Sequence, residues 1–149
     1  MVEVELDQSE EWGEDRDWQA LADAAVAQAF VVVGFATNAN VSISISLSNN
    51  DEVQALNAQW RDKDKPTNVL SFPAFPLRPG MAPKPLLGDI VLAFETVERE
   101  ARAEAKPFEH HLSHLIAHGL LHLFGHDHQT DVEAEIMEQL ERQILARLA

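Results

Sequence analysis

Apolar and polar residues alternate with a period of two in parts of the chain, and this period is typical of β-strands with one buried face. In residues 41–48, valine, isoleucine and leucine side chains alternate with four serines. Residues 2–6 show a shorter alternation with acids, and the stretches 69–72 and 87–94 are short and mostly apolar. These four segments predict a small mixed β-sheet.

Other segments repeat apolar residues every three to four positions, which predicts amphipathic helices. Asn49 or Asn50 can cap one of them, and Gly34 suits the end of the helix before it. Together with the sheet, about five helices predict an α+β fold with a single domain over residues 1–149. The predicted helices cover residues 17–33, the stretch after Asn49, and residues 95–106, 107–124 and 131–148.

The apolar faces of these helices predict the core. In the helix at 107–124 the face consists of Leu112, Leu115, Ile116, Gly119, Leu120 and Leu123. The helix after Asn49 is expected to turn Val53, Leu56 and Trp60 inward. The last helix is expected to place its acids outside and to bury Val132, Ile136, Leu140, Ile144 and Leu148.

Cysteine is absent from the 149 residues, so disulfides and thiolate metal ligands are excluded and any zinc must be held by nitrogen or oxygen. The acidic N-terminal stretch lacks the basic region of a signal peptide. The longest apolar run, residues 29–36, is too short to cross a bilayer. We therefore expect a cytoplasmic protein without a membrane-spanning segment.

The formal net charge of -14 argues against a general nucleic-acid binder, because phosphate contacts require lysine and arginine. Charge is unevenly distributed, however. Residues 61–87 contain five basic residues against two aspartates. Five prolines within 73–86 predict that this part of the stretch is a long loop. This stretch is interpreted either as a solvated loop or as a local basic surface. The basic residues are Arg61, Lys63, Lys65, Arg78 and Lys84.

Seven histidines lie between residues 110 and 128. His118 and His122 are four residues apart, so they share one helix face, and Gly125 allows the chain to turn and bring His128 to them. Three protein ligands with one open position are typical of catalytic zinc. The spacing is that of the metzincin proteases, but position 119 is glycine where those enzymes carry their glutamate base, which argues against a peptidase.

The other histidines have weaker interpretations. His126 is the rival for the third ligand, and Asp127 is expected to accept a hydrogen bond from a ligand imidazole. We expect His110 and His111 at the surface or behind the ligands. His114, one helical turn before His118, has the same expectation and is also a candidate for proton transfer.

Three stretches together resemble the bacterial YbeY endoribonucleases, also called rRNA maturation factors: residues 56–73 (LNAQWRDKDKPTNVLSFP), 87–90 (LGDI) and 118–128 (HGLLHLFGHDH). The resemblance implies a zincin-like domain with a central metal-bearing helix, one Zn²⁺ held by His118, His122 and His128, and cleavage of single-stranded RNA. It also makes Arg61 the functional arginine beside the metal. Asn68 and His126 depart from an aspartate and a tyrosine that are common in the family.

The resemblance further implies maturation of the 3′ end of small-subunit ribosomal RNA and ribosome quality control. The implied partners are ribosomal RNA, the small ribosomal subunit and a ribosomal protein or Era-type assembly GTPase, without DNA or membrane. Either a metal-activated water or the RNA 2′-OH can be the nucleophile. The alternative is a non-catalytic assembly factor with a structural zinc, which the missing general base and the net charge of -14 favour.

Overall fold

The computed structural model describes residues 2–36 and 40–148, and in this part of the chain it contains a mixed four-stranded sheet in the order β1-β2-β4-β3. Strands β1 (Glu3–Gln8), β2 (Ser42–Ser48) and β4 (Leu86–Ala93) are parallel. Strand β3 (Val69–Pro73) pairs antiparallel with β4. All four strands fall on the segments where the sequence predicts them.

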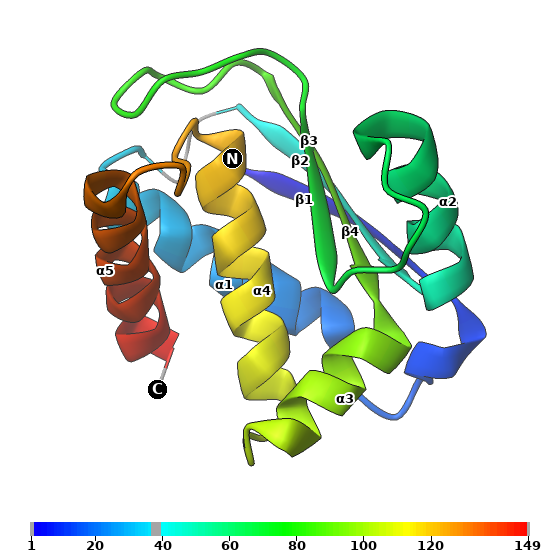
Figure 1. The fold of residues 1–149 in the computed structure, drawn as a ribbon. Helices are drawn as coiled ribbons and strands as arrows, with labels where there is room; N and C mark the ends of the chain where they lie inside the picture. Colours follow the sequence, from blue (N-terminus) through cyan, green and yellow to red (C-terminus); the bar gives the residue numbers. More distant parts are fainter. Residues whose placement is uncertain (1, 37–39, 149) are drawn as a thin grey trace.

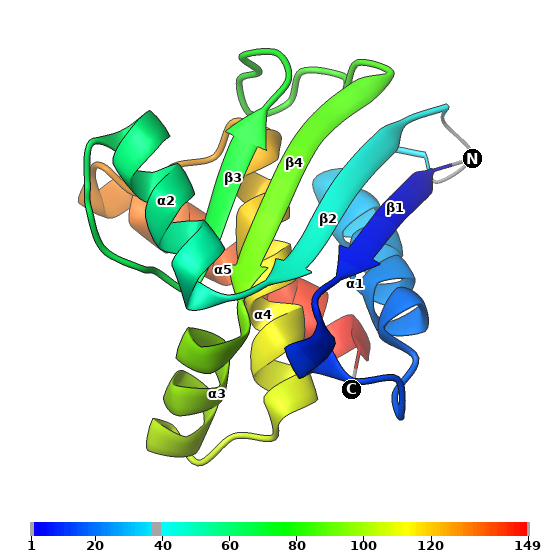
Figure 2. The same cartoon turned by 90° about the vertical axis from the view of Figure 1, so that its right-hand side faces the viewer.

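Helices cover the two faces of the sheet unequally (Figures 1 and 2). On one face lie α1 (Trp18–Val33), α4 (Phe108–Leu123) and α5 (Asp131–Leu148), whereas α2 (Asn50–Arg61) lies on the other face near β3 and β4. Helix α3 (Phe94–Ala103) continues from the end of β4 and packs against α4. These five helices and the mixed sheet confirm the predicted α+β class.

Helix starts and ends follow the polar residues next to them. The side chain of Asp17 accepts a hydrogen bond from the backbone N–H of Ala20 at 3.0 Å and caps α1. Of the two candidate asparagines, Asn49 caps α2 by accepting from the N–H of Glu52 at 2.9 Å. Gly34 ends α1 with φ +88°, a left-handed conformation that glycine adopts without steric cost.

The core lies between the sheet and the helices α1, α4 and α5, which cover one face of the sheet. On β2, Ile43, Ile45 and Leu47 are buried. All six residues predicted for the inner face of α4 are buried, and α4 packs against α1, α3, α5, β3 and β4. Helix α4 is therefore central to the packing, and the histidines that it carries are held on a rigid element.

Two predicted helix faces are wrong in part. Trp60 is 63% exposed, and α2 buries Asn57 instead, whose side-chain amide donates to the carbonyl of Lys65 at 2.9 Å. On α5, Val132 and Ile136 are exposed. The buried positions there are Met137, Glu141 and Ile144, a stripe rotated by one residue from the prediction. An acid expected outside is thus inside, because histidines of α4 pair with it.

The acidic stretch after β1 is anchored to the core. It forms a short 3-10 helix, η1 (Glu10–Trp12), in which Trp12 is 2% exposed. The indole N–H of Trp12 donates to the carbonyl of Ser48 at 2.8 Å, which ties this stretch to the end of β2. In the described part of the chain, no helix is both long and apolar enough to cross a membrane.

Candidate metal centre

Three histidine rings meet where α4 ends. His118 and His122 project from the last turns of α4, and His128 follows the exit turn. One ring nitrogen from each lies within 4.8 Å of the other two. The Nε2 atoms of His118 and His122 are 3.1 Å apart. This cluster has the nitrogen donors and the spacing to hold one metal ion.

Hydrogen bonds behind the rings determine which nitrogens face the centre. The Nδ1 atom of His118 lies 2.6 Å from Oε2 of Glu141, and Nδ1 of His122 lies 3.0 Å from the backbone carbonyl of His126. Carboxylate and carbonyl oxygens only accept, so both Nδ1 atoms carry the hydrogen. When both rings are neutral, the lone pairs of the two Nε2 atoms point at each other, which is unfavourable without a cation between them.

The surroundings of His122 disfavour a proton on its ring. Burial lowers the pKa of the His122 imidazole, and the neighbouring His118 and His128 lower it further. A ring that resists protonation stays available as a neutral ligand. The residues present therefore fit a borderline-soft divalent cation such as zinc, which imidazole nitrogens bind.

The rival ligand, His126, has a different place in the structure. Its carbonyl accepts from His122, and its own N–H donates to the carbonyl of Leu121 at 2.9 Å, so its backbone holds the exit turn together. Burial lowers the pKa of its side chain. Among the residues that the structure describes, the cluster with metal-binding spacing contains His128 and not His126.

Glu141 is the site residue that the sequence analysis missed. It comes from α5, is 8% exposed, and its two carboxylate oxygens contact His114 at 2.8 Å and His118 at 2.6 Å. Burial alone would raise the pKa of this carboxyl group, but the hydrogen bonds from His114 and His118 outweigh it and lower the pKa to about 2. Glu141 also takes the role expected of Asp127, whose carboxylate accepts from the backbone N–H of His128 instead.

Arg61, at the end of α2, is held without a carboxylate partner. Its guanidinium donates to the carbonyl of Ser71 and lies over the ring of Phe72, 5.3 Å from the ring centroid. No ion pair joins it to Asp62, Asp64 or any other acid in the described residues. The charge of Arg61 is therefore available to a ligand.

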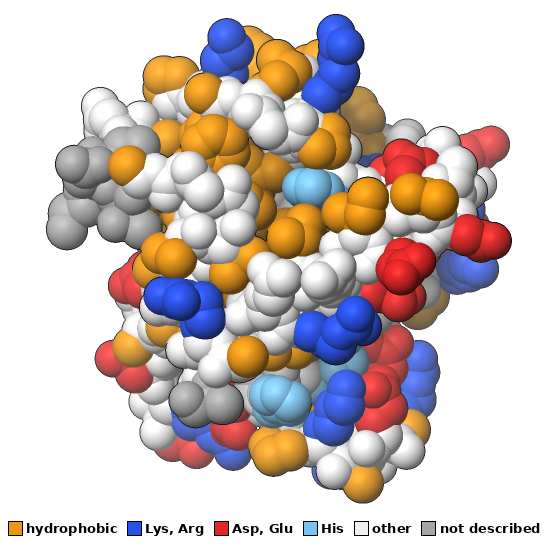
Figure 3. Space-filling view, turned by 90° about the vertical axis from the view of Figure 1, so that its left-hand side faces the viewer, with side chains coloured by type: hydrophobic (Ala, Val, Ile, Leu, Met, Phe, Trp, Pro, Cys, Tyr) orange, Lys and Arg blue, Asp and Glu red, His pale blue; other side chains and the backbone are white. Residues whose placement is uncertain are grey.

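A cleft of about 920 Å³ joins the histidines to the basic stretch. The rim of the cleft carries the cations Arg61, Lys63 and Lys65, while His118, His122 and His128 line it from α4 and the exit turn. The face shown in Figure 3 carries both signs of charge, with acidic side chains mainly along the right-hand edge and basic side chains scattered over the top and the middle. The cleft thus combines a metal ligand set with positive charge in a protein that is acidic overall.

The proline-rich loop between β3 and β4 packs on the exit turn of α4. Gly125 has φ +100°, and a Cβ atom at this position would lie 2.3 Å from the carbonyl oxygen of Leu77. Glycine is therefore required both by the left-handed backbone and by the close approach of the loop. The loop helps to fix the turn that delivers His128.

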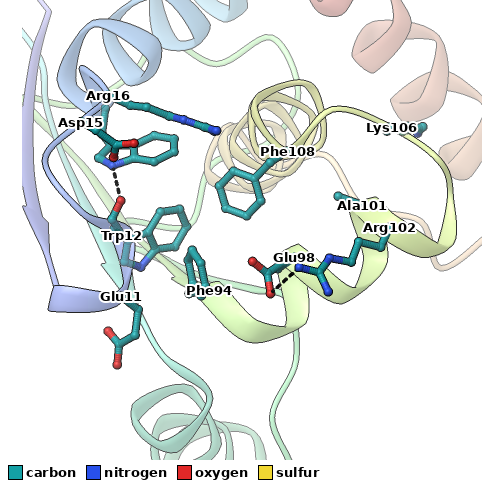
Figure 4. Close-up of a pocket in the computed structure, with 11 residues that line it drawn as sticks. Glu11, Trp12, Asp15, Arg16, Phe94, Glu98, Ala101, Arg102, Lys106 and Phe108 are labelled. Carbon is teal, nitrogen blue, oxygen red and sulfur yellow. Dashed lines mark hydrogen bonds and ion pairs between the residues drawn. The ribbon is translucent and has the colours of Figure 1, made fainter.

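A second cavity lies at the opposite end of α4 and has different chemistry (Figure 4). The rings of Trp12, Phe94 and Phe108 point toward one another there, with centroids 5.3 to 5.6 Å apart, so their faces are largely used in packing. Its cations are paired with acids: Arg16 with Glu109, Arg102 with Glu98 and Lys106 with Glu104. In the described residues, this cavity of about 290 Å³ has no cation without an acidic partner, unlike the histidine cleft.

The fold and the site define an α+β protein with a three-histidine centre in a basic cleft. The chain belongs to the family described as endoribonuclease YbeY, whose model matches residues 3–149. It is 48% identical over 139 residues to the endoribonuclease YbeY of Bartonella bacilliformis, an alignment that covers 93% of this chain and 87% of that protein. It is 47% identical to the Zymomonas mobilis protein of the same name, over 99% of this chain and 90% of the relative.

Two further similarities concern the share of each chain that is matched and the fold. The chain is 59% identical over 106 residues to the endoribonuclease YbeY of Sinorhizobium fredii, where the match spans 71% of this chain and 61% of that protein. The solution structure of a Thermotoga maritima protein matches with a TM-score of 0.63 and 26% identity, over 99% of this chain and 88% of that one. The family resemblance expected from the three sequence motifs is thereby confirmed.

Proposed function

We propose that this protein is a zinc-dependent, single-strand-specific endoribonuclease, acting as one domain over residues 1–149. The observation that carries the proposal is the convergence of three imidazole nitrogens in the same cleft as an arginine that no acid neutralises. The relatives named endoribonuclease YbeY support the choice of RNA as substrate. The local basic surface supplies the phosphate contacts that the acidic remainder of the chain cannot.

Zinc is the ion that the donor set fits best. Three histidines, His118, His122 and His128, leave one coordination position open, as in catalytic zinc sites. The chain has no cysteine to complete a structural four-ligand site. When bound, zinc supplies a Lewis acid that polarises a phosphoryl oxygen and lowers the pKa of a water molecule to about 7.

The side chains of the cleft have separable tasks. Arg61 presents a planar guanidinium that can bind two oxygens of one phosphate, and the Ser71 carbonyl and the Phe72 ring hold it in place. Lys63 and Lys65, which are exposed, attract the flanking phosphates. His114 contacts Glu141 and does not line the cleft that contains Arg61.

We place this activity in the cytoplasm, in maturation of the 3′ end of small-subunit ribosomal RNA and in ribosome quality control. The proposed partners are ribosomal RNA, the small ribosomal subunit and a ribosomal protein or an Era-type assembly GTPase, without DNA or membrane. Family membership supports this context. An acidic protein with one basic cleft suits a defined RNA segment better than RNA in general.

The second candidate function is a non-catalytic ribosome assembly factor in which zinc is structural. The net charge of -14 favours it, as does glycine at position 119, where a metzincin protease carries its general base. Such a factor would bind RNA through the basic cleft and leave it intact.

Cleavage of a defined single-stranded RNA by the purified zinc-loaded protein distinguishes the two functions. The expected result is cleavage by the wild type, loss of cleavage in His118→Ala, and little cleavage of the same sequence in a duplex. His110→Ala is the matched control, since His110 is an exposed histidine of the same helix. RNA binding without cleavage by the zinc-loaded wild type would favour the assembly factor.

A further inference from the structure

We propose that Glu141 is a positioning residue of the metal centre: by accepting from Nδ1 of His118, it presents Nε2 of that ring to the shared ion. Nothing in the ligand spacing points to α5, yet α5 supplies this contact. The proposal rests on the proposed function only in taking His118, His122 and His128 as the metal ligands. It makes α5 a part of the centre and not merely a cover for the core.

The geometry leaves His118 one orientation. Oε2 of Glu141 is 2.6 Å from Nδ1 of His118, a length typical of a strong hydrogen bond to a charged group. A carboxylate has no hydrogen to give, so the ring donates and keeps Nε2 free. Neutral imidazole exchanges between two tautomers, and only the one with the hydrogen on Nδ1 can bind a metal through Nε2. Glu141 selects that tautomer before the ion arrives.

The burial of Glu141 is hard to explain by packing alone. Its neighbours on the same face, Met137 and Ile144, are apolar and buried. A buried carboxylate loses its hydration at a large cost in free energy, and apolar residues of similar volume are often as stable or more stable at such positions. A structural requirement would therefore favour leucine. A metal centre requires an acceptor behind a ligand imidazole, since such acceptors orient the ring and raise its basicity.

His114 completes this arrangement. Its Nε2 atom donates to Oε1 of Glu141 at 2.8 Å, so the carboxylate is held from both sides. The Nδ1 atom of His114 is buried and has no hydrogen-bond partner in the described residues. The ring lines a smaller cavity of about 340 Å³ beside α5, which His118 and His128 also line. His114 therefore acts through Glu141, by bracing it, while its role in proton transfer stays a prediction.

The three ligand histidines therefore differ in what orients their rings. His118 is oriented by a carboxylate and His122 by the carbonyl of His126. For the ring of His128, which is exposed, the described residues provide no such hydrogen bond. His118 is thus the anchor of the centre, and loss of its acceptor should weaken metal binding more than loss of any exposed acid nearby.

The test uses zinc affinity and ring tautomers, neither of which requires RNA. Glu141→Leu keeps the volume and removes the acceptor, Glu141→Gln keeps an acceptor oxygen, and Glu138→Leu is the matched control on an exposed position of α5. Zinc affinity is measured by competition with a chelator. We expect it to fall by about ten- to a hundredfold in Glu141→Leu, to recover largely in Glu141→Gln, and to be unchanged in Glu138→Leu.

Two further measurements separate positioning from structural support. The melting temperature of zinc-free Glu141→Leu should equal or exceed that of the wild type, while its zinc affinity falls. In the zinc-free wild type, ¹⁵N NMR should show the His118 hydrogen on Nδ1, and Glu141→Leu should show a mixture of tautomers. A lower melting temperature with unchanged zinc affinity would overturn the proposal. If Glu141→Leu does not fold, a mixture of His118 tautomers in the zinc-free wild type would equally overturn it.

Failure of this inference is distinguishable from failure of the proposed function. A wild-type protein that binds zinc without cleaving RNA leaves the Glu141 measurements fully informative. A wild-type protein that binds no zinc refutes both the metal centre and the role of Glu141.

Discussion

The Nε2 atoms of His118 and His122 lie 3.1 Å apart, and the other nitrogen of each ring is already hydrogen-bonded. Two nitrogens on one tetrahedral zinc, each at about 2.0–2.1 Å, are separated by about 3.3 Å. The distance between the two rings is therefore close to that of a shared ion. Because α4 fixes both backbones, the spacing follows from the helix and from the two acceptors behind the rings.

We expect the purified protein to contain about one zinc per chain. His118→Ala, His122→Ala and His128→Ala should each lose most of it, because two imidazoles bind zinc far more weakly than three. His126→Ala is the control and should retain zinc. Metal analysis of the four variants checks the assignment. Full zinc in His128→Ala together with loss in His126→Ala would mean that the third ligand is His126.

Zinc retention should fall as the pH is lowered, because the ligand histidines bind the metal only when they are unprotonated. The pKa of His122 is lowered by burial and by its neighbours, so this ligand stays neutral below its ordinary value of 6.5. Protonation competes with the metal only at lower pH, so zinc and its stabilisation should be fully present at neutral pH and lost in acid. A melting-temperature series from pH 8 to about 4, with and without a chelator, measures this. Equal melting temperatures with and without chelator at pH 8 would contradict it.

The basic surface should carry most of the RNA affinity. Reversing Lys63 and Lys65 to glutamate should weaken RNA binding and flatten its dependence on salt, because fewer counterions are released on binding. The matched control reverses Arg102 and Lys106, which changes the net charge equally at the far end of α4. Binding constants at several salt concentrations provide the comparison. If both double variants bind alike, the attraction is a property of total charge and not of the cleft.

Gly125→Ala should damage the metal centre through the loop that covers it. The substitution combines a strained φ of +100° with a Cβ placed 2.3 Å from the Leu77 carbonyl oxygen. Gly80→Ala is a matched control, with φ +90° in the same loop and nothing within 4 Å of its Cβ. We expect a loss of about 1–2 kcal/mol for the control and at least 1 kcal/mol more for Gly125→Ala. Chemical denaturation measures both, and zinc affinity should fall only in Gly125→Ala.

The helix α4 and its histidines were predictable because both depend on local spacing. The inner face of α4 repeats every three to four residues, and the interval between His118 and His122 is fixed by one helical turn. Gly125 allows the chain to turn back after the helix, so His128 could be predicted as the third ligand. These features need no knowledge of which element packs against which.

Glu141 was not predictable, because its role depends on how α5 is rotated against α4. The apolar pattern of α5 is compatible with two neighbouring stripes, and the stripe with Val132 and Ile136 contains no buried acid. The contacts of Glu141 with His114 and His118 favour the other stripe, in which Glu141 is buried. Trp60 was misplaced for a related reason: periodicity predicted an inward face for the last turn of α2, where the structure instead buries Asn57.

Arg61 should be essential for turnover, and its loss should lower the folding stability only modestly. In the described residues no acid forms an ion pair with its guanidinium, so its charge is not neutralised within the protein. Arg61→Ala removes one hydrogen bond to Ser71 and a contact with Phe72, which together contribute about 1–2 kcal/mol of stability. Zinc content should not change, since no hydrogen bond in the described residues joins this side chain to a ligand histidine.

Loss of a preorganised donor that binds the phosphate should lower the rate of RNA cleavage by about ten- to a thousandfold in Arg61→Ala. Arg61→Lys should recover only part of this, because lysine keeps the charge and loses the planar fork that binds two oxygens. Arg102→Ala, which removes an arginine at the far end of α4, is the control and should cleave as the wild type does. Single-turnover cleavage, zinc content and melting temperature are measured on all three variants. Near-normal cleavage by both Arg61 variants would remove Arg61 from the active site, and the three histidines would then be the remaining catalytic elements of the cleft.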